Sequence, residues 1–300
     1  SKIEAGQRRL IALVKERPRL YIFLKITGLL YIHRYLRDFY HLLRYGRKKE
    51  IIINGMSFMF PIMDNATRNF FFDPCWLGEI WEKDVVHHFI KNLEGCSCFI
   101  DIGAHVGFYS LIAAKIIAPR GGVVHAVEMD LDNITRLKSA IRLNNLNNIT
   151  VHHAAIGDHQ GEVEYSCCGA ECNTLNIGSD KRVYTKRSVQ MITLDNLVAT
   201  ERLNPDIIKI DVEGAEYLVL LGMRKALRLN NLKIYCEAHL HQDRGSLSSF
   251  GHSPKDVVQV LKEYSYTIEQ IGLKQGSKIK QGIIHDLQDT KENVMLFIHR

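Results

Sequence analysis

The feature that most constrains the fold is an alternation of strand-like and helix-like segments that begins at Cys96. Apolar, β-prone runs lie at 98–102, 122–127, 148–154, 206–211, 232–238, 266–271 and 294–299, and helical patterns at 107–118, 131–144, 214–229 and 254–264. Strand–helix–strand repetition predicts an α/β fold, with a mostly parallel sheet covered on both faces. The last two runs are joined only by a polar segment, so we expect them to pair antiparallel as a terminal hairpin on a seven-stranded sheet.

The first 74 residues have a different character and are predicted to form an extension to a domain at 75–300. Residues 5–45 have the apolar spacing of helices, broken near Pro18, and Asn54-Gly55 predicts a hairpin between short β-prone runs. Residues 1–50 contain thirteen Lys and Arg against four acidic residues, a balance of +9, whereas the whole chain carries +6. A helix at 77–93 is expected to lead into the main domain.

The basic, aromatic-rich segment at 1–50 has two interpretations. It resembles an interfacial helix that binds an anionic membrane surface. Alternatively, its apolar side packs on the catalytic domain or on a second copy of the chain in a homo-oligomer. The longest nearly uncharged run, residues 20–32, is shorter than the roughly 20 residues of a membrane span. Seven cysteines, an odd number, fit reduced thiols. We therefore expect a cytoplasmic protein, with peripheral membrane attachment as a hypothesis.

The stretch "FIDIGAHVGFYS", residues 99–110, predicts a ligand-binding turn at the carboxyl end of the first sheet strand. Gly103 and Gly107 permit close backbone approach, but their spacing is not that of the dinucleotide-binding fingerprint. Asp101 would repel a pyrophosphate and attract a cationic amino group. Glu128, at the end of the second strand, is suited to accept hydrogen bonds from both ribose hydroxyls. Together these residues predict S-adenosylmethionine as the cofactor.

These segments resemble the FkbM family of S-adenosylmethionine-dependent methyltransferases. The resemblance covers about residues 75–270 and is carried by "FIDIGAHVGFYS", "VVHAVEMD", "VQMITLDNL", "PDIIKIDVEGAEYLVLLG" and "YCEAHLH". His105 and Met129 depart from the Asn and Pro usual there. The resemblance implies a class I, Rossmann-like methyltransferase fold and methyl transfer to hydroxyl oxygens of sugars or glycolipids. The expected cofactor-binding residues are Asp101, Gly103, His105, Gly107, Phe108, Tyr109, Glu128, Ala155, Asp158 and Asp211.

Within that set, the end of the third strand is assigned to the adenine. Small Ala154 and Ala155 leave room for a planar ring, and Asp158 is placed to meet its amino group. Plain packing of two small residues is the alternative.

The candidate catalytic residues follow the fourth and fifth strands, and they are His239, Asp211, Glu237 and Glu213. Methyl transfer to a hydroxyl requires positioning and removal of a proton. We expect His239 to act as the base, with Asp211 and Glu237 orienting it or the acceptor. Glu213 and Glu216 have an alternative role as acids at a helix N-terminus. A divalent metal on the carboxylates and His239 is a further alternative, but no regular ligand spacing supports one, so no metal is expected.

Alternative interpretations apply to one loop, to one group of cysteines and to the function of the whole protein. The loop at 241–254 is a candidate lid over the acceptor, or a merely solvated connection. Cys167, Cys168 and Cys172, with Glu171, form either a zinc site or ordinary thiols. A nucleic-acid methyltransferase that binds RNA through the basic N-terminus, and a non-catalytic scaffold, are the alternative functions. Nucleic acid is disfavoured because the basic charge is confined to one segment.

Overall fold

The computed structural model describes residues 47–64, 67, 71, 82–167, 173–174, 185–240, 246–273, 282–283 and 293–300. The chain separates into two compact units, Ser1–Trp81 and Glu82–Arg300. The helices predicted at 5–45 lie outside the described residues, so membrane attachment through them stays a prediction. Among the described helices, none combines the length and the apolar composition that crossing a bilayer requires.

In the first unit, β1 (Lys48–Ile53) and β2 (Met56–Pro61) form the predicted antiparallel hairpin. Asn54 and Gly55 join the strands with positive φ angles of 48° and 77°, the conformation that a two-residue type I′ turn requires. Phe60 and Phe71 are buried with ring centroids 4.8 Å apart. The hairpin thus contributes apolar side chains to its own unit.

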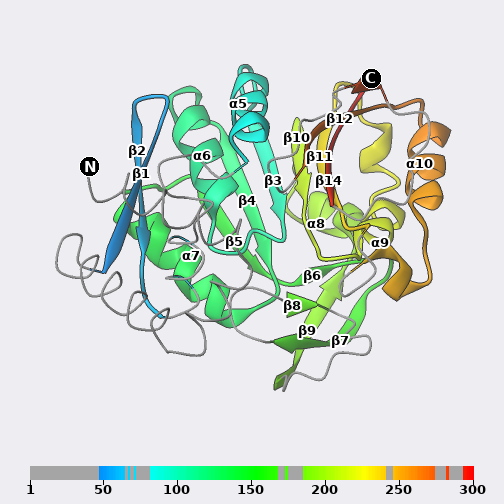
Figure 1. Ribbon diagram of the computed structural model, residues 1–300, viewed down its shortest axis with the longest axis horizontal. Coiled ribbons are helices and arrows are strands. Elements are labelled where there is room, and N and C mark those ends of the chain that lie inside the picture. The colour runs from blue at the N-terminus through cyan, green and yellow to red at the C-terminus, as the bar shows by residue number, and fades with distance from the viewer. Residues whose placement is uncertain are drawn as a thin grey trace, which may run out of the picture. The chain divides into compact units, whose positions relative to one another are not determined.

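The second unit is built on a mixed sheet with the order β13-β12-β14-β11-β10-β3-β4-β5 (Figure 1). The parallel strands are β3 (Cys98–Ile102), β4 (Val123–Glu128), β5 (Ile149–His153), β10 (Ile207–Ile210) and β11 (Lys233–Ala238). Strand β14 (Val294–His299) runs antiparallel to both β11 and β12 (Thr267–Leu273). The seven predicted strands and the terminal hairpin are confirmed, and β13 (Gly282–Ile283) adds a short edge.

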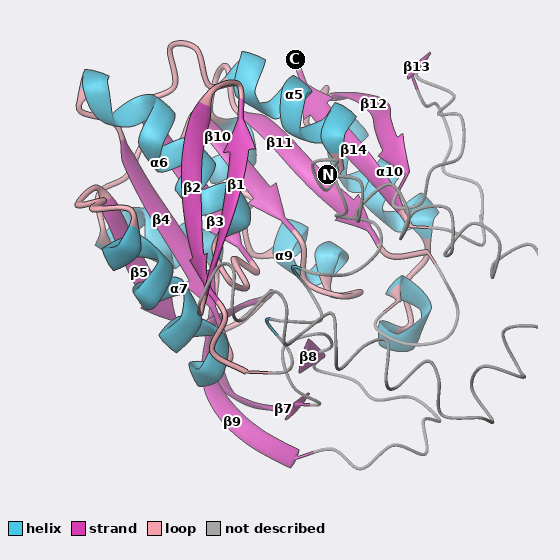
Figure 2. Cartoon of the chain, turned by 60° about the vertical axis from the view of Figure 1, so that its left-hand side comes forward, coloured by secondary structure: helices cyan, strands magenta, loops and turns pink. Residues whose placement is uncertain are grey.

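Side chains of alternate residues on these strands enter two apolar layers, one on each face of the sheet. On one face Ile100, Ile208 and Ile234 join a cluster that includes residues of α8 (Leu194–Thr200), α9 (Glu216–Leu221) and α10 (Pro254–Glu263). On the other face Phe99 and Tyr235 contact Phe89 of α5 (Lys83–Asn92). Figure 2 shows the strands of the main sheet side by side. Alternation places the odd-numbered Asp101, Lys209 and Glu237 on the α5 face, within an otherwise apolar layer.

A second sheet, with the order β6-β9-β7-β8, was not predicted. Its strands are β6 (Ala155–Ile156), β7 (Gly161–Cys167), β8 (Asn173–Thr174) and β9 (Thr185–Ile192). Strands β7 and β9 pair antiparallel over seven residues, although residues of the connection at 168–184 separate them in sequence. Tyr165, Val189 and Met191 are buried between them and Ala155. Because these strands pair outside the main sheet, the strand–helix alternation carried no signal for them.

The helices α6 (Phe108–Ile117), α7 (Leu131–Leu143) and α10 lie where the sequence predicts them. A 3₁₀ turn at Ala118–Arg120 follows α6. The helix predicted at 214–229 is shorter, ending as α9 at Leu221 before a 3₁₀ turn at Ala226–Arg228. The carboxylate of Asp195 explains this break, because it accepts hydrogen bonds from the backbone N–H groups of Lys225 and Ala226 at 2.8 and 2.9 Å.

Part of the predicted lid, residues 246–254, is described by the structure. Residues 246–254 form a 3₁₀ turn at Leu247–Phe250 and the start of α10, and Leu247 is buried in the main core. Residues 241–245 lie outside the described residues, and so does His241. A covering role for the loop 241–254 stays a prediction.

Candidate active site

The strand order brings the predicted site residues to one edge of the sheet. Asp101 lies near the end of β3, Glu128 ends β4, Asp211 follows β10, and Glu237 and His239 lie at the end of β11. Since β4, β3, β10 and β11 are neighbours in that order, their carboxyl ends meet at the crevice where α/β sheets bind ligands.

The turn after β3 packs against the end of β10. Gly103 has φ 79°, and a Cβ atom there would lie 1.8 Å from the carbonyl oxygen of Asp211. Gly107 has φ 89°, and its Cβ would lie 2.3 Å from Cδ1 of Leu137 in α7. At both positions the chain itself leaves no room for a side chain, so glycine is required there whether or not a ligand binds. The turn is further held because Val127 accepts hydrogen bonds from the N–H groups of Gly103 and Ala104.

Glu128 ties the turn to β4. Its Oε2 accepts a hydrogen bond from the backbone N–H of His105 at 2.7 Å, and its Oε1 accepts one from Asp130 at 2.9 Å. Burial raises the pKa of Glu128 to about 7. His105, at φ 54°, thus contributes through its backbone. Each carboxylate oxygen has a second lone pair, so Glu128 retains the capacity to accept from two ribose hydroxyls.

Asp101 is buried with one oxygen bonded and the other open. Oδ2 accepts a hydrogen bond from the Ser110 hydroxyl at 2.5 Å. Oδ1 has no hydrogen-bond partner among the described residues. Burial raises the pKa of this carboxyl group, and the nearby charge of Lys209 opposes that rise. A buried acceptor without a partner costs free energy, so Oδ1 is the atom that an ammonium group would satisfy. This observation fits the amino group of S-adenosylmethionine.

The remaining residues assigned to the cofactor have other contacts. Ala155 is buried with Tyr165 and Met191, which agrees with the packing alternative. Asp158 lies at the surface beside His159, with Oδ1 and Nδ1 2.7 Å apart. Phe108 is buried and packs edge-on against Tyr109. None of these contacts tests cofactor binding, so these assignments stay predictions.

Two charged residues of the site were missed from the sequence. Lys209 is buried opposite Asp101, with its Nζ 2.8 Å from Oδ2 of Asp211 and 4.8 Å from the centre of the Tyr109 ring. Burial lowers its pKa, but the charges of Asp211 and Asp101 outweigh burial and hold the pKa above its usual value. The signal was present, because Lys209 is the one charged residue within the apolar run 207–210.

The second missed residue is Glu82, whose Oε2 accepts a hydrogen bond from the Tyr109 hydroxyl at 2.7 Å. Burial and the charge of Glu237 raise its pKa to about 7. Glu82 precedes α5 with a left-handed φ of 47°. Nothing in the local sequence indicates that a residue 19 positions before Asp101 returns to this edge.

Four acidic side chains surround the imidazole of His239. Nδ1 lies 2.7 Å from Oε1 of Glu216, which also accepts a hydrogen bond from the N–H of Gly214 at 2.9 Å. Nε2 lies 3.4 Å from Glu213, 3.6 Å from Glu237 and 3.9 Å from Asp211. Nε2 makes no hydrogen bond to any of the described residues. The structure thus brings together all four residues predicted to be catalytic.

The acidic surroundings change the expected behaviour of His239. Burial lowers its pKa, but the charges of Glu213, Glu216 and Glu237 outweigh burial and raise the pKa to about 10. In this arrangement the imidazole holds a proton at neutral pH. The near-neutral base expected from the sequence therefore does not match these surroundings, because the acids come from separate segments that only folding assembles.

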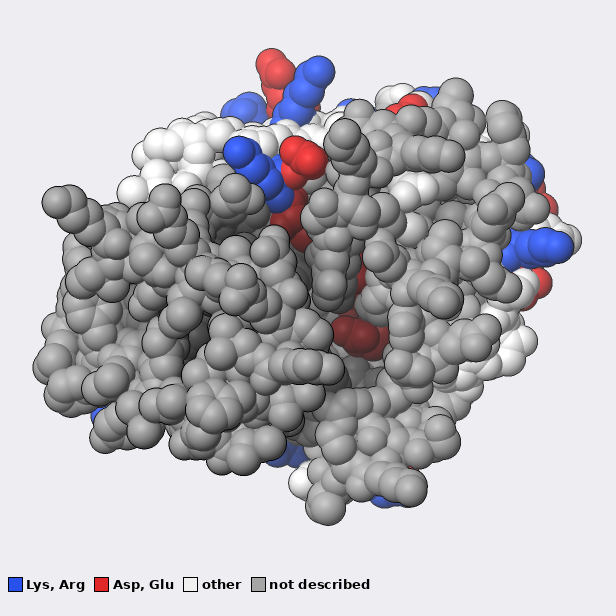
Figure 3. Space-filling model, viewed as in Figure 1, with Lys and Arg blue, Asp and Glu red and all other residues white. Residues whose placement is uncertain are grey.

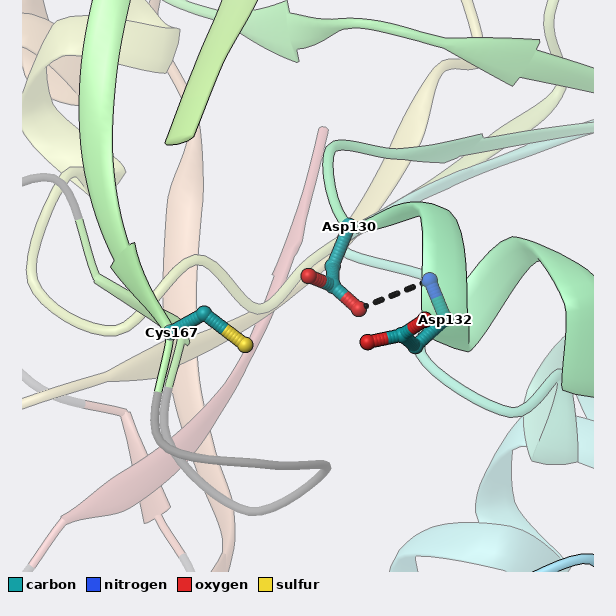
Figure 4. Close-up of side chains that lie close together, drawn as sticks. All are labelled: Asp130, Asp132 and Cys167. Carbon is teal, nitrogen blue, oxygen red and sulfur yellow. Dashed lines mark hydrogen bonds between the residues drawn. The ribbon is translucent and has the colours of Figure 1, made fainter. Parts of the chain in front are cut away.

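A second group of potential metal ligands, Asp130, Asp132 and Cys167, is already engaged (Figure 4). Oδ1 of Asp130 accepts a hydrogen bond from the N–H of Asp132, and Asp130 thereby caps the N-terminus of α7. The Arg187 guanidinium lies 2.9 Å from Oδ2 of Asp130 and 2.9 Å from Oδ2 of Asp132. The arginine supplies the positive charge that a metal would bring, so this group links β9 to α7. The other residues of the zinc alternative, 168–172, lie outside the described residues.

Charged side chains of both signs occur together on the surface. On the face in Figure 3, described Lys and Arg side chains lie beside Asp and Glu side chains along the upper edge of the view. The described residues there form no continuous basic surface of the kind that tracks a nucleic-acid backbone.

Comparison with known proteins identifies the family. A model of the methyltransferase FkbM domain matches residues 101–268, more than half of the chain. The hexuronic acid methyltransferase AglP of Haloferax volcanii is 26% identical over 201 residues, covering 64% of this chain and 75% of that protein. The crystal structure of methyltransferase FkbM from Methylobacillus flagellatus is similar with a TM-score of 0.42 and 19% identity, over 68% of this chain and 43% of that one. The 16S rRNA N2 G1207 methyltransferase RsmC of Thermus thermophilus, in complex with AdoMet and guanosine, has a TM-score of 0.42 and 15% identity, over 85% of this chain and 50% of that one. The chain belongs to the methyltransferase FkbM domain family and is an S-adenosylmethionine-dependent methyltransferase.

Proposed function

We propose that the protein transfers a methyl group from S-adenosylmethionine to a hydroxyl group of a sugar, in a glycan, a glycolipid or a related small acceptor. The observation that carries this proposal is the acidic cluster around His239, at the same sheet edge as Asp101 and Glu128. Carboxylate oxygens accept hydrogen bonds from the hydroxyls of a polyol. The name of the Haloferax relative, a hexuronic acid methyltransferase, supports a sugar as the acceptor class.

The cofactor is assigned to the β3–β4 side of the site. Oδ1 of Asp101 would accept from its ammonium group, and the Glu128 carboxylate would accept from its ribose hydroxyls. When bound, S-adenosylmethionine supplies an activated methyl group whose bond to sulfur breaks as the new carbon–oxygen bond forms. The chain then has two tasks, which are to position the acceptor hydroxyl and to take its proton.

We assign these tasks to Asp211 and Glu213 because their side chains are the most exposed to an incoming acceptor. Their side chains are 27% and 36% exposed, whereas those of His239, Glu216 and Glu237 are 4% exposed or less. An acceptor that enters the site therefore meets Asp211 and Glu213 first. Their carboxylates hold the hydroxyl and receive its proton, and Lys209 fixes the orientation of Asp211 through Oδ2. His239 is a positioning residue behind them.

The test is transfer of radiolabel from methyl-labelled S-adenosylmethionine. The full chain is offered lipid-linked glycan, uronic acid-containing oligosaccharides and total RNA in separate reactions. We expect label in a sugar fraction, recovered after acid hydrolysis as an O-methyl monosaccharide. Label in RNA alone, or no label in any sugar from a protein that binds the cofactor, would overturn the proposal.

A further inference from the structure

We propose that Asp211, Glu213 and His239 bind one divalent metal ion, of which Mn²⁺ is the best representative. Binding of the ion does not depend on the acceptor proposed above. It does depart from the expectation drawn from the sequence, in which irregular ligand spacing argued against a metal.

Potential ligand atoms of the three side chains lie close enough together to share one ion. One potential ligand atom from each of the three side chains lies within 4.8 Å of the others. Nε2 of His239 is 3.4 Å from Glu213 and 3.9 Å from Asp211. Ligands about 2.2 Å from a common ion are about 3 Å apart when adjacent and about 4.4 Å apart when opposite. The two separations from Nε2, 3.4 and 3.9 Å, fall within that range.

The buried imidazole is an independent observation that points to an ion. His239 is 2% exposed, and its Nε2 is directed toward three carboxylates. It lies 3.4–3.9 Å from their oxygens and makes no hydrogen bond to any described residue. Glu216 accepts a hydrogen bond from Nδ1–H, so an ion that displaces the proton from Nε2 would meet the imidazole lone pair there. Nε2 is therefore the atom that would bind the metal.

Hydrogen bonds from neighbouring residues orient His239 and Asp211, as is common for the ligands of a metal site. Glu216 is fixed by the Gly214 N–H and in turn orients His239, which is the carboxylate–histidine–metal arrangement. Lys209 binds Oδ2 of Asp211 and leaves Oδ1 on the side of His239. Two carboxylates with one imidazole suit Mn²⁺, since carboxylates favour Mg²⁺, Ca²⁺ and Mn²⁺, whereas imidazole favours transition metals.

A cation here would change what the site can hold. It would offset the negative charge of Glu213, Glu237 and Asp211, so that an anionic acceptor such as a uronic acid is not repelled. An acceptor hydroxyl that coordinates the ion would also lose its proton more readily. This consequence rests on the proposed function, whereas the site itself does not.

The test is titration of the full chain with Mn²⁺ alone, followed by electron paramagnetic resonance, without cofactor or acceptor. We expect one bound ion per chain and hyperfine coupling to a histidine nitrogen. Glu213→Gln should lower the affinity for Mn²⁺ by about tenfold or more, because it removes a charged ligand. Glu216→Gln should lower it by about 10–100-fold through His239. Glu164→Gln is the matched control, since this glutamate is 67% exposed and pairs with Lys186 on the second sheet.

Three results would overturn the inference. The first is equal Mn²⁺ affinity in Glu213→Gln and Glu164→Gln, the second is bound Mn²⁺ without nitrogen coupling, and the third is no binding of Mn²⁺. Circular dichroism checks the fold of every variant, and Glu213→Gln carries the test if changes at buried positions prevent folding. Sugar labelling that persists without any Mn²⁺ binding would reject the inference and leave the proposed function standing. Mn²⁺ binding without sugar labelling would do the reverse.

Discussion

The backbone of Asp211 approaches Gly103 so closely that a Cβ atom on the glycine would lie 1.8 Å from the Asp211 carbonyl oxygen. This contact joins the turn after β3 to the end of β10. Asp101 precedes the turn, and Asp211 belongs to the acidic cluster. The ends assigned to cofactor and acceptor are therefore held in one packed arrangement, and a change at the contact should affect both.

Replacing Gly103 with alanine should destabilise the second unit by about 3 kcal/mol or more, because it combines a left-handed φ with a backbone clash. Gly95→Ala is the matched control, since Gly95 has φ 77° and nothing within 4 Å of an added Cβ. It should cost only about 1 kcal/mol. Urea denaturation followed by circular dichroism measures both, and equal losses would show that the approach of Asp211 is unimportant.

Replacing Arg187 with methionine should destabilise the protein by about 2–4 kcal/mol, because it leaves the buried carboxylate of Asp130 without its cationic partner. Lys186→Met removes the neighbouring cation, whose pair with Glu164 is exposed, and should cost less than about 0.5 kcal/mol. The two variants are compared in denaturant. The Tyr165 hydroxyl also donates to Oδ2 of Asp130, at 3.2 Å. A small effect at Arg187 would mean that this bond and the backbone N–H groups of Asp132 and Asn133 suffice for Asp130.

Glu128→Ala should weaken binding of S-adenosylmethionine by about 1–3 kcal/mol, since ribose hydroxyls would lose their acceptor. Isothermal titration calorimetry measures the affinity, and circular dichroism confirms that the turn at His105 has not unfolded the domain. Glu162→Ala, an exposed position on β7, is the control. Unchanged affinity in Glu128→Ala would remove this residue from the cofactor site.

The same residue predicts a pH dependence of stability. Burial raises the pKa of Glu128 from 4.5 to about 7, so between these values the folded chain holds a proton that the unfolded chain has released. The free energy of unfolding should therefore fall as pH rises through this window, with a contribution from Glu128 of about 3 kcal/mol.

Denaturation of wild type and Glu128→Gln at pH 4.5 and pH 8 isolates this contribution from that of the other acids. The wild type should lose more stability than the variant over this interval. Parallel pH profiles would contradict the assignment.

Much of the main sheet follows from the sequence alone. The run 98–102 became β3 without any change of bounds, and Asn54-Gly55 became the predicted hairpin turn. Strand and helix periodicities differ along the chain, and turn residues restrict φ locally, so both signals survive without tertiary context. Because the strand–helix alternation implies a shared carboxyl edge, it also predicted that Asp211, Glu213, Glu237 and His239 would lie near one another.

What only the tertiary structure decided is how those groups act on one another. The sequence places His239 close to Glu237, but Glu213 reaches the imidazole from the β10–α9 connection and Glu216 from the first residue of α9. Glu82 enters the site from the residue before α5, and Lys209 enters it from within β10. The pKa of His239 and the spacing of the potential metal ligands depend on burial and on distances of a few ångströms. Local periodicity in the sequence encodes neither quantity. The sequence by itself therefore determined the sheet and its edge, and the packing of separate segments decided the charge state and geometry of the site.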